Sequence, residues 1–190
     1  MKPGKVIVIA APSGCGKSTI IKAILQRGGL DIAFAVSATT RAPREGEKHG
    51  ESYFFITEEE FRKGIAADAF VEYEEVYPGR FYGTPKAEIE RITSEGHNVL
   101  LDIDVNGALR VKKMFGSQAI TIFIEPPTIA ELRRRLEDRG TETPESLAKR
   151  VERAEYEISK AREFDVTILN DNLTEAVDKT YSTIENFTKC

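Results

Sequence analysis

The stretch Val6-Ile-Val-Ile-Ala-Ala-Pro-Ser-Gly-Cys-Gly-Lys-Ser-Thr19 decides the fold of this chain of 190 residues. It opens with an apolar, mostly β-branched run, which is typical of a strand buried on both faces of a parallel sheet. A glycine-containing turn follows, and the residues from Ser18 to Arg27 then have the pattern of a helix that ends at Gly28-Gly29. A strand, a glycine-rich turn and a helix in this order predict an α/β domain with a phosphate-binding loop.

The turn has the composition that a bound triphosphate requires. Small residues let backbone N–H groups converge on phosphate oxygens at the positive end of the helix dipole. Lys17 would reach the β- and γ-phosphates, and the Ser18 hydroxyl would ligate Mg²⁺. The consensus G-x-x-x-x-G-K-[ST] is met except at its first position, where Ala11 replaces glycine. An ordinary strand-to-helix connection is the alternative. The order of the elements favours an ATP-binding loop made of Ala11, Pro12, Ser13, Gly14, Cys15, Gly16, Lys17, Ser18 and Thr19.

Cys15 within this loop has two interpretations. The consensus asks for nothing in particular at its position, which favours a small space-filling residue. A helix N-terminus can also lower the pKa of a thiol, so Cys15 could be sensitive to oxidants when no nucleotide covers it.

The rest of the chain alternates buried strands with helices. Apolar runs predict strands at 98–103, 119–125 and 165–170, and a closing helix extends from about Leu173 to Phe187. This alternation implies right-handed βαβ crossovers and a mainly parallel sheet with helices on both faces. Asp102 lies near the end of the run at 98–103. An aspartate in such an apolar run is not expected to be solvated surface, and its burial without a partner would be costly. We therefore expect it on the metal side of the triphosphate site, directly or through water.

Two insertions interrupt the core, which comprises residues 1–36, 97–127 and 164–190. Residues 37–96, called the acceptor subdomain below, contain strand patterns at 53–56 and 70–76 and a short helix near 58–64, which predicts a small α+β unit. Residues 128–163, called the lid, have the pattern of two helices. The first ends at Gly140, and the second has Thr143 as N-cap and Pro144 at its first position.

The composition excludes several functional classes. A formal net charge of -4, from 27 basic and 31 acidic residues, argues against a general nucleic-acid or anionic-membrane binder. Cys15 and Cys190 lie far apart and suggest free thiols in a reducing compartment, with the cytoplasm as the expected location. No apolar run is long enough for a secretory signal or a membrane span.

The acceptor subdomain begins with Ser37-Ala-Thr-Thr-Arg-Ala-Pro-Arg-Glu-Gly-Glu47, and Tyr53 follows after a short loop. Arg41 and Arg44 are three residues apart, and guanidinium groups match phosphate geometry. Together with nearby hydroxyl groups they predict a pocket for a second phosphate monoester.

These motifs resemble the guanylate kinase family of P-loop nucleoside monophosphate kinases. The resemblance rests on Ser-x-Thr-Thr-Arg-x-Pro-Arg-x-Gly-Glu, Ala-Pro-Ser-Gly-x-Gly-Lys and Arg139-Gly-Thr-Glu-Thr143, and covers nearly the whole chain. It implies a three-layer P-loop NTPase fold with an inserted acceptor subdomain and a helical lid. It also implies transfer of the γ-phosphoryl group of ATP to GMP in GMP recycling, with Mg²⁺ as cofactor and dGMP as a further acceptor.

The resemblance also assigns roles to individual residues. The GMP phosphate would be bound by Ser37, Arg41, Arg44, Tyr53 and Tyr82. The guanine would be bound by Glu72, Thr84 and Asp104, with Thr84 standing where many relatives have serine. Asn170 is assigned to the ATP site. The catalytic set comprises Lys17, Arg44 and the lid residues Arg135, Arg139 and Arg150, which would close over the transferred group.

The chemistry of the proposed base site agrees with guanine. One carboxylate, such as Glu72, can accept both the N1–H and the N2 amino group, and the Thr84 hydroxyl can donate to O6. Adenine would leave the carboxylate facing a lone pair, so discrimination of roughly 10⁴-fold is within reach. Two alternatives remain. Glu72 could belong to a solvated charge run with Glu74 and Glu75, and Thr84 could cap the helix that follows.

Other interpretations of the site stay open. Tyr53 and Tyr82 could be packing residues, the lid arginines could lie on a solvated amphipathic face, and His49 and His97 are read as incidental. A related kinase could use another nucleoside monophosphate or a sugar phosphate as acceptor. A related binding module could grip phosphorylated peptides, although such modules can dispense with the phosphate-binding loop that this chain retains.

Overall fold

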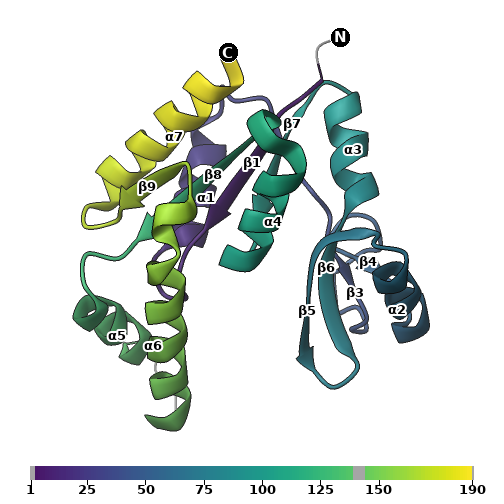
Figure 1. Cartoon of the computed structure of the whole chain (residues 1–190), viewed down its shortest axis with the longest axis horizontal. Coiled ribbons are helices and arrows are strands. Elements are labelled where there is room, and N and C mark those ends of the chain that lie inside the picture. The colour runs from purple at the N-terminus through teal and green to yellow at the C-terminus, as the bar shows by residue number, and fades with distance from the viewer. Residues whose placement is uncertain (1–2, 139–143, 190) are drawn as a thin grey trace.

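The structure is a computed structural model that describes residues 3–138 and 144–189 (Figure 1). Its core is a five-stranded parallel sheet with the strand order β2-β7-β1-β8-β9. The strands are β1 (Val6–Ala10), β2 (Ile32–Phe34), β7 (Asn98–Asp102), β8 (Ala119–Glu125) and β9 (Val166–Leu169). The predicted α/β fold with a mainly parallel sheet is therefore confirmed.

Helices cover both faces of this sheet. On one face lie α1 (Lys17–Arg27) and α7 (Leu173–Lys189), and on the other lie α3 (Lys86–Ser94) and α4 (Val105–Phe115). Alternate residues of β1 belong to different hydrophobic clusters, because successive side chains of a strand point to opposite faces. Two short 3₁₀ helices, η1 (Gly116–Gln118) and η2 (Ala161–Glu163), lead into β8 and β9. The result is the predicted three-layer arrangement.

The acceptor subdomain has a second sheet, with the order β4-β3-β6-β5. Its elements are β3 (Ala38–Thr39), β4 (Phe54–Phe55), α2 (Glu58–Ala66), β5 (Phe70–Tyr77) and β6 (Arg80–Pro85). Thr57 caps α2 through a capping box with Glu60. Phe61 stacks on Phe70 and Phe81 at centroid distances of 4.4 and 5.1 Å and so forms a small separate core. The acceptor subdomain thus has a hydrophobic cluster of its own, separate from those of the main sheet.

The lid contains α5 (Ile129–Glu137) and α6 (Pro144–Ser159), which pack against each other. Thr128 caps α5 by accepting a hydrogen bond from the Glu131 backbone N–H at 3.0 Å. Pro144 begins α6, as predicted, whereas Gly140 and Thr143 lie outside the described residues. Figure 1 shows α5 and α6 at the lower left of the molecule and the β5–β6 hairpin at the lower right, with the main sheet above them.

Several observed elements differ from the sequence expectations. Helix α1 begins at Lys17 rather than Ser18, and α7 extends to Lys189. The strands β2, β3 and β6 had no predicted counterpart, because the first two are only three and two residues long and β6 contains Gly83 and Pro85. Thr84 does not cap α3, since Pro85 occupies the N-cap position.

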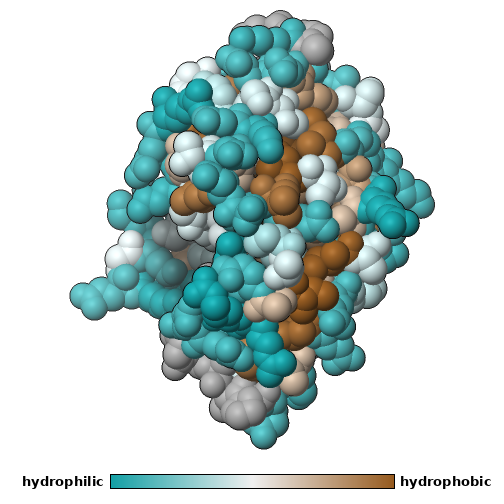
Figure 2. All heavy atoms as spheres, turned by 90° about the vertical axis from the view of Figure 1, so that its left-hand side faces the viewer, coloured by the Kyte–Doolittle hydropathy of each residue, from teal (hydrophilic) through white to brown (hydrophobic). Residues whose placement is uncertain are grey.

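The outer face of the lid and of α7 is mostly hydrophilic, with apolar surface running between the polar side chains (Figure 2). Large apolar side chains exposed on these elements and on β9 include Ile129, Leu169 and Leu173. Among the helices of residues 3–138 and 144–189, none combines the length and apolar character needed to cross a bilayer.

Candidate active site

The phosphate-binding loop lines a cavity of about 540 Å³ at the carboxyl end of the main sheet. Gly14 and Gly16 adopt left-handed φ values of 92° and 82°, which turn the chain from β1 into α1. A Cβ on Gly16 would lie only 2.7 Å from Asn170 Nδ2, so a larger residue does not fit there. All nine predicted loop residues line this cavity, together with Asp102, Ile103, Asp104, Arg150, Arg153 and Glu157.

Lys17 forms an ion pair with Asp102 Oδ1, and both residues line this cavity. The register of the sheet brings them together, because Ile9 near the end of β1 pairs with Asp102 at the end of β7. The Asp102 side chain is 34% exposed, so the expectation that it would be shielded from solvent was wrong. The strand ends there, and its last side chain faces the open cavity rather than the core.

Asn170 supports the loop from behind. It follows β9, is 5% exposed, and its Nδ2 donates to the Cys15 carbonyl at 2.7 Å. Its backbone N–H donates to the Glu125 carbonyl at 2.8 Å, which fixes it to the neighbouring strand. The structure therefore gives Asn170 a loop-holding role, whereas direct contact with ATP stays a prediction.

Cys15 is a fully buried free thiol. Burial raises its pKa to about 12, with smaller contributions from the carboxylates of Glu157 and Glu125 and opposing ones from Arg135 and Lys17. This direction is opposite to the lowered pKa that oxidant sensitivity requires. The structure thus favours the space-filling interpretation.

A second cavity, of about 350 Å³, lies between the main sheet and the acceptor subdomain. Ser37, Tyr53 and Thr84 line it from the subdomain side. Asp102 and Ile103 line it from the carboxyl end of β7. Because Asp102 and Ile103 also line the loop cavity, both cavities adjoin the carboxyl end of this strand.

Arg41 is held in place by Glu47 and two tyrosines. Its Nη1 and Nη2 contact the two Glu47 carboxylate oxygens at 2.7 and 2.8 Å, and its Nε donates to Tyr82 Oη at 3.2 Å. Its guanidinium lies 5.3 Å from the Tyr53 ring centroid. The hydrogen bonds from Arg41 and from the Arg44 backbone lower the Glu47 pKa to about 2. Tyr53 and Tyr82 therefore support Arg41 as well as pack.

Glu47 was not among the predicted site residues, although it ends the quoted motif. It also accepts a hydrogen bond from the Arg44 backbone N–H at 2.7 Å, so one carboxylate fixes both arginine positions. The Arg44 side chain itself is exposed. The sequence signal that could have identified Glu47 is its place within six positions of both arginines.

Glu72 and Thr84 form a buried pair at 9% and 1% exposure. They face each other across β5 and β6, and the Thr84 hydroxyl donates to Glu72 Oε1 at 2.6 Å. Burial raises the Glu72 pKa, which the Thr84 hydrogen bond partly offsets. The solvated-edge interpretation was therefore wrong for Glu72, although Glu74 and Glu75 are exposed. The sequence predicted that the Thr84 hydroxyl would donate to guanine O6. In the structure its single proton is donated to Glu72 instead.

Asp104 caps α4 by accepting a hydrogen bond from the Gly107 backbone N–H at 2.8 Å. It lines the loop cavity rather than the one between sheet and subdomain. Gly107 lets α4 approach the base site closely, since a Cβ there would lie 2.9 Å from Glu72 Cβ. Asp104 thus has a structural role at this corner, and its contact with guanine stays a prediction.

The structure describes two of the three arginines that were predicted for the lid. Arg150 Nη1 lies 3.4 Å from Ser13 Oγ of the phosphate-binding loop, and Arg135 Nε donates to Glu131 Oε1 at 2.8 Å. Arg135 also lies close enough to Cys15 to lower its pKa. Arg139 lies outside the described residues. Arg150 is solvent-exposed and at the same time lies beside the phosphate-binding loop.

Sequence reasoning missed Arg153 and Glu157, which line the loop cavity beside Arg150. Glu157 is 7% exposed, and burial raises its pKa, an effect that Arg153 and Lys17 oppose. The sequence signal that could have identified them is their spacing from Arg150, which places Arg153 and Glu157 on the same face of the helix.

The histidines make local contacts away from both cavities. His49 Nδ1 accepts a hydrogen bond from the Phe55 backbone N–H at 3.2 Å, and His97 Nδ1 lies 2.7 Å from Asp31 Oδ1. Neither lines the two cavities that adjoin Asp102.

Comparisons with known proteins agree with this geometry. A family model described as guanylate kinase matches residues 3–187. A protein named guanylate kinase from Bacteroides fragilis is 51% identical over 183 residues, covering 96% of this chain and 89% of its own length. One from Porphyromonas gingivalis is 49% identical, with coverages of 96% and 97%. The crystal structure of guanylate kinase from Anaplasma phagocytophilum matches with a TM-score of 0.72 and 32% identity, covering 99% of this chain and 88% of that one. This chain belongs to the guanylate kinase family.

Proposed function

We propose that this chain transfers the γ-phosphoryl group of ATP to GMP and so produces ADP and GDP. One observation carries this proposal beyond family membership: the loop cavity and the cavity beside the acceptor subdomain share Asp102 and Ile103. A donor bound in the first cavity and an acceptor bound in the second would therefore meet at one place. Proximity of this kind supplies much of the catalysis of phosphoryl transfer.

The donor end would hold the triphosphate of ATP. Backbone N–H groups of the loop and the N-terminus of α1 would bind phosphate oxygens, and Lys17 would exchange its contact with Asp102 for the β- and γ-phosphates. Asn170 keeps the loop in position through the Cys15 carbonyl.

The residues present also fit Mg²⁺. This ion prefers oxygen ligands and usually keeps several waters, so one or two protein oxygens suffice beside substrate phosphates. The Ser18 hydroxyl and the Asp102 carboxylate both line the loop cavity and would supply them, directly or through water. When bound, the ion would neutralise negative charge on the phosphates.

The acceptor end would hold GMP. We assign its phosphate to Ser37, Arg41, Arg44, Tyr53 and Tyr82, and its guanine to Glu72, Thr84 and Asp104. A carboxylate at Glu72 would accept the two guanine N–H groups, and Thr84 would then have to redirect its proton from Glu72 toward O6. This arrangement favours guanine over adenine, because adenine would place an acceptor at N1 against the buried carboxylate.

Phosphoryl transfer here needs no general base. The nucleophile is a phosphate oxygen that is already anionic at neutral pH, so the main obstacle is repulsion between two anions. Lys17, Arg44 and the lid arginines Arg135, Arg139 and Arg150 would offset that repulsion and stabilise the charge spread over the transferred group. Closure of lid and acceptor subdomain would exclude water, which otherwise competes as acceptor.

Finer properties follow as proposals. The named contacts address the base and the phosphate of the acceptor, so we expect dGMP to be a substrate as well. Cys15 is an unpaired thiol, which fits a cytoplasmic location. A phosphopeptide-binding module is disfavoured, because such a module has no use for Lys17, Asp102 and Arg150 gathered around one cavity.

One assay tests the proposed function. ADP formation from ATP and Mg²⁺ is measured with GMP, dGMP, AMP, CMP, UMP and dTMP as separate acceptors, and GDP is identified as the second product. We expect GMP and dGMP to be used at least about 10³-fold better than AMP, as judged from kcat/KM. Comparable activity with AMP, or none with GMP, would contradict the proposal.

A further inference from the structure

One face of the lid helix α6 carries three charged residues, Arg150, Arg153 and Glu157, which lie three and four positions apart. All three line the loop cavity. Arg150 reaches the loop itself, since its Nη1 lies 3.4 Å from Ser13 Oγ. This face of the lid therefore looks onto the proposed donor site, although only Arg150 has a role there so far.

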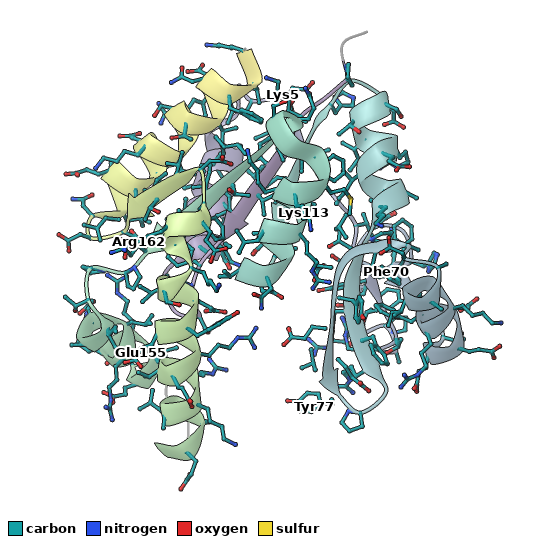
Figure 3. The ribbon with its side chains drawn as sticks, in the orientation of Figure 1. Lys5, Phe70, Tyr77, Lys113, Glu155 and Arg162 are labelled. Carbon is teal, nitrogen blue, oxygen red and sulfur yellow. The ribbon has the colours of Figure 1, made fainter. Side chains whose placement is uncertain are left out.

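Arg153 bridges two bodies of the molecule. Its Nε donates to Glu157 Oε1 on its own helix at 3.2 Å, and its Nη1 donates to Glu74 Oε1 on β5 at 3.3 Å. Glu157 is 9% exposed at its side chain, whereas Glu74 is 47% exposed. One guanidinium thus has a buried partner in the lid and an exposed partner in the acceptor subdomain. Figure 3 shows charged side chains of α6 and of β5 in the space between the two elements.

Glu74 lies on the same face of β5 as the proposed guanine ligand Glu72. It follows Glu72 by two residues in a continuous register, so both side chains point to the same face. On β6, Glu72 pairs with Thr84 and Glu74 pairs with Tyr82, whose hydroxyl contacts Arg41. Arg153 therefore reaches the strand face that carries the proposed base and phosphate ligands of GMP.

Stability alone does not account for this arrangement. The Arg153–Glu74 pair is about half exposed at both side chains, and ion pairs of this kind contribute little to folding. A buried carboxylate at a phosphate site repels the substrate unless it has a cation to hold. Glu157 has two nearby, Arg153 and Lys17. The cluster instead suits a contact between parts that approach each other.

We propose that Arg153 is a positioning residue that couples closure of the lid to closure of the acceptor subdomain, with Glu157 holding it and Glu74 receiving it. The proposal rests on the function argued above. ATP draws the lid inward and GMP draws the acceptor subdomain inward, and the Arg153–Glu74 contact makes each movement favour the other. Because such coupling is reciprocal, ATP tightens GMP binding by the same factor as GMP tightens ATP binding.

The decisive measurement is this coupling factor. The Kd of GMP is determined by calorimetry with and without a saturating non-hydrolysable ATP analogue and Mg²⁺, for the wild type, Arg153→Lys, Glu74→Gln and the double variant. Lysine keeps the charge but lacks the fork that serves two carboxylates. We expect each single variant to lower the coupling factor about two- to fivefold. The coupling factor of the double variant should be no lower than that of the more strongly affected single variant. Additive losses, an unchanged factor, or a wild type without coupling would overturn the proposal.

Two further variants separate positioning from folding. Glu157→Gln removes the holder and should lower the coupling factor as Arg153→Lys does, with the GMP Kd in the absence of the analogue unchanged. Glu155→Gln, an exposed position on the same helix, should match the wild type (Figure 3). A Glu157→Gln variant that lowers only the melting temperature and leaves the coupling factor intact would reduce Glu157 to a structural residue and overturn its assigned role.

A distance measurement keeps the proposal testable whatever the acceptor proves to be. Spin labels at Glu155→Cys and Tyr77→Cys, in a Cys190→Ser background, report the separation of α6 from the end of β5. Cys15 is fully buried and its pKa is raised to about 12, so it should react slowly with the label. With the ATP analogue bound, Arg153→Lys should broaden the distance distribution. Identical distributions would overturn the coupling, whereas a wild type that fails to phosphorylate GMP would instead disprove the proposed function.

Discussion

The donor and acceptor ends of the site are built in different ways. The donor end centres on one continuous loop between β1 and α1, to which the neighbouring strand β7 adds Asp102 and the lid helix α6 adds Arg150. The acceptor end draws its proposed ligands from β5, β6, the residues around β3 and β4, and the N-cap of α4, up to 67 positions apart between Ser37 and Asp104. A continuous motif carries its own geometry, whereas a dispersed site depends on strand register.

The two ends also hold their cations differently. Lys17 and Asp102 are 21% and 34% exposed and face an open cavity, so the lysine can leave its partner for a phosphate. The Arg41 side chain is 8% exposed and is gripped by both oxygens of Glu47. The donor cation is thus held loosely by a replaceable partner, and the acceptor cation is held rigidly by a permanent one. The predictions below test this contrast.

The largest effect should come from Lys17→Ala. Removal of the loop cation takes away a charge that stabilises the transition state, and we expect kcat to fall by about 10³-fold. The Kd of GMP in the absence of ATP should change less than twofold, because Lys17 belongs to the donor end. Steady-state kinetics and calorimetry check both statements. A larger change in GMP binding than in kcat would break the proposed separation of the two ends.

Glu72→Gln should produce the next largest effect, this time at the acceptor end. The amide cannot accept both guanine N–H groups and brings a donor of its own, so kcat/KM for GMP should fall by about 10²-fold. Glu75→Gln is a matched control, since Glu75 is an exposed residue of the same strand. The measurement is kcat/KM for GMP and AMP. Equal losses for the two nucleotides would argue against Glu72 as the guanine-reading residue.

Most of the donor end could be predicted from sequence because its physics is local. A β-branched run, a glycine turn and Gly-Lys-Ser-Thr are together enough to predict the sheet, the loop and the place of Lys17. The position of Asp102 at the strand end was predicted correctly, but its solvent exposure was not predicted. A strand pattern does not show where the strand stops facing the core.

The acceptor end was predicted mainly through family resemblance. The Glu72–Thr84 hydrogen bond requires two strands in one register, and β6 itself has no clear strand signal around Gly83 and Pro85. Glu47 and Arg153 act through partners that only the folded chain brings near them. Residues that hold other residues leave a weaker mark on a sequence than residues that bind substrate directly.

Glu47→Gln and Glu131→Gln compare the two ends through their supporting carboxylates. Both carboxylates are held at a pKa of about 2 by hydrogen bonds to arginine, Glu47 to Arg41 and Glu131 to Arg134 and Arg135. Loss of a charged hydrogen bond should raise the KM for GMP about tenfold in Glu47→Gln, and lower kcat by a similar factor in Glu131→Gln. The reverse assignment of KM and kcat effects would contradict the roles of Arg41 and Arg135.

The pH dependence of stability gives the same pair of variants an independent measurement. A carboxylate whose pKa is lowered on folding stabilises the folded state above its unfolded pKa, near 4.5, and loses that contribution as the pH falls toward about 2. Acid unfolding followed by circular dichroism should therefore be less steep over this range in either variant than in the wild type. A wild-type slope in Glu47→Gln would mean that the Arg41 contact does not persist in solution.

Asn170→Ala should have the smallest effect and is the finest test of the donor end. Its side chain donates to the Cys15 carbonyl at 2.7 Å, so the loop would lose one hydrogen bond while keeping every proposed phosphate ligand. We expect the KM for ATP to rise about fivefold, the size of one neutral hydrogen bond, and the KM for GMP to stay the same. Asn98→Ala is the matched control, because Asn98 bonds Lys5 and Asp31 at the opposite end of β7. If both variants lower stability and only Asn170→Ala raises the KM for ATP, the loop depends on support from β9 as well as on its own sequence. If neither changes the KM, the nine loop residues hold their shape alone, and the contrast with the dispersed acceptor end becomes sharper still.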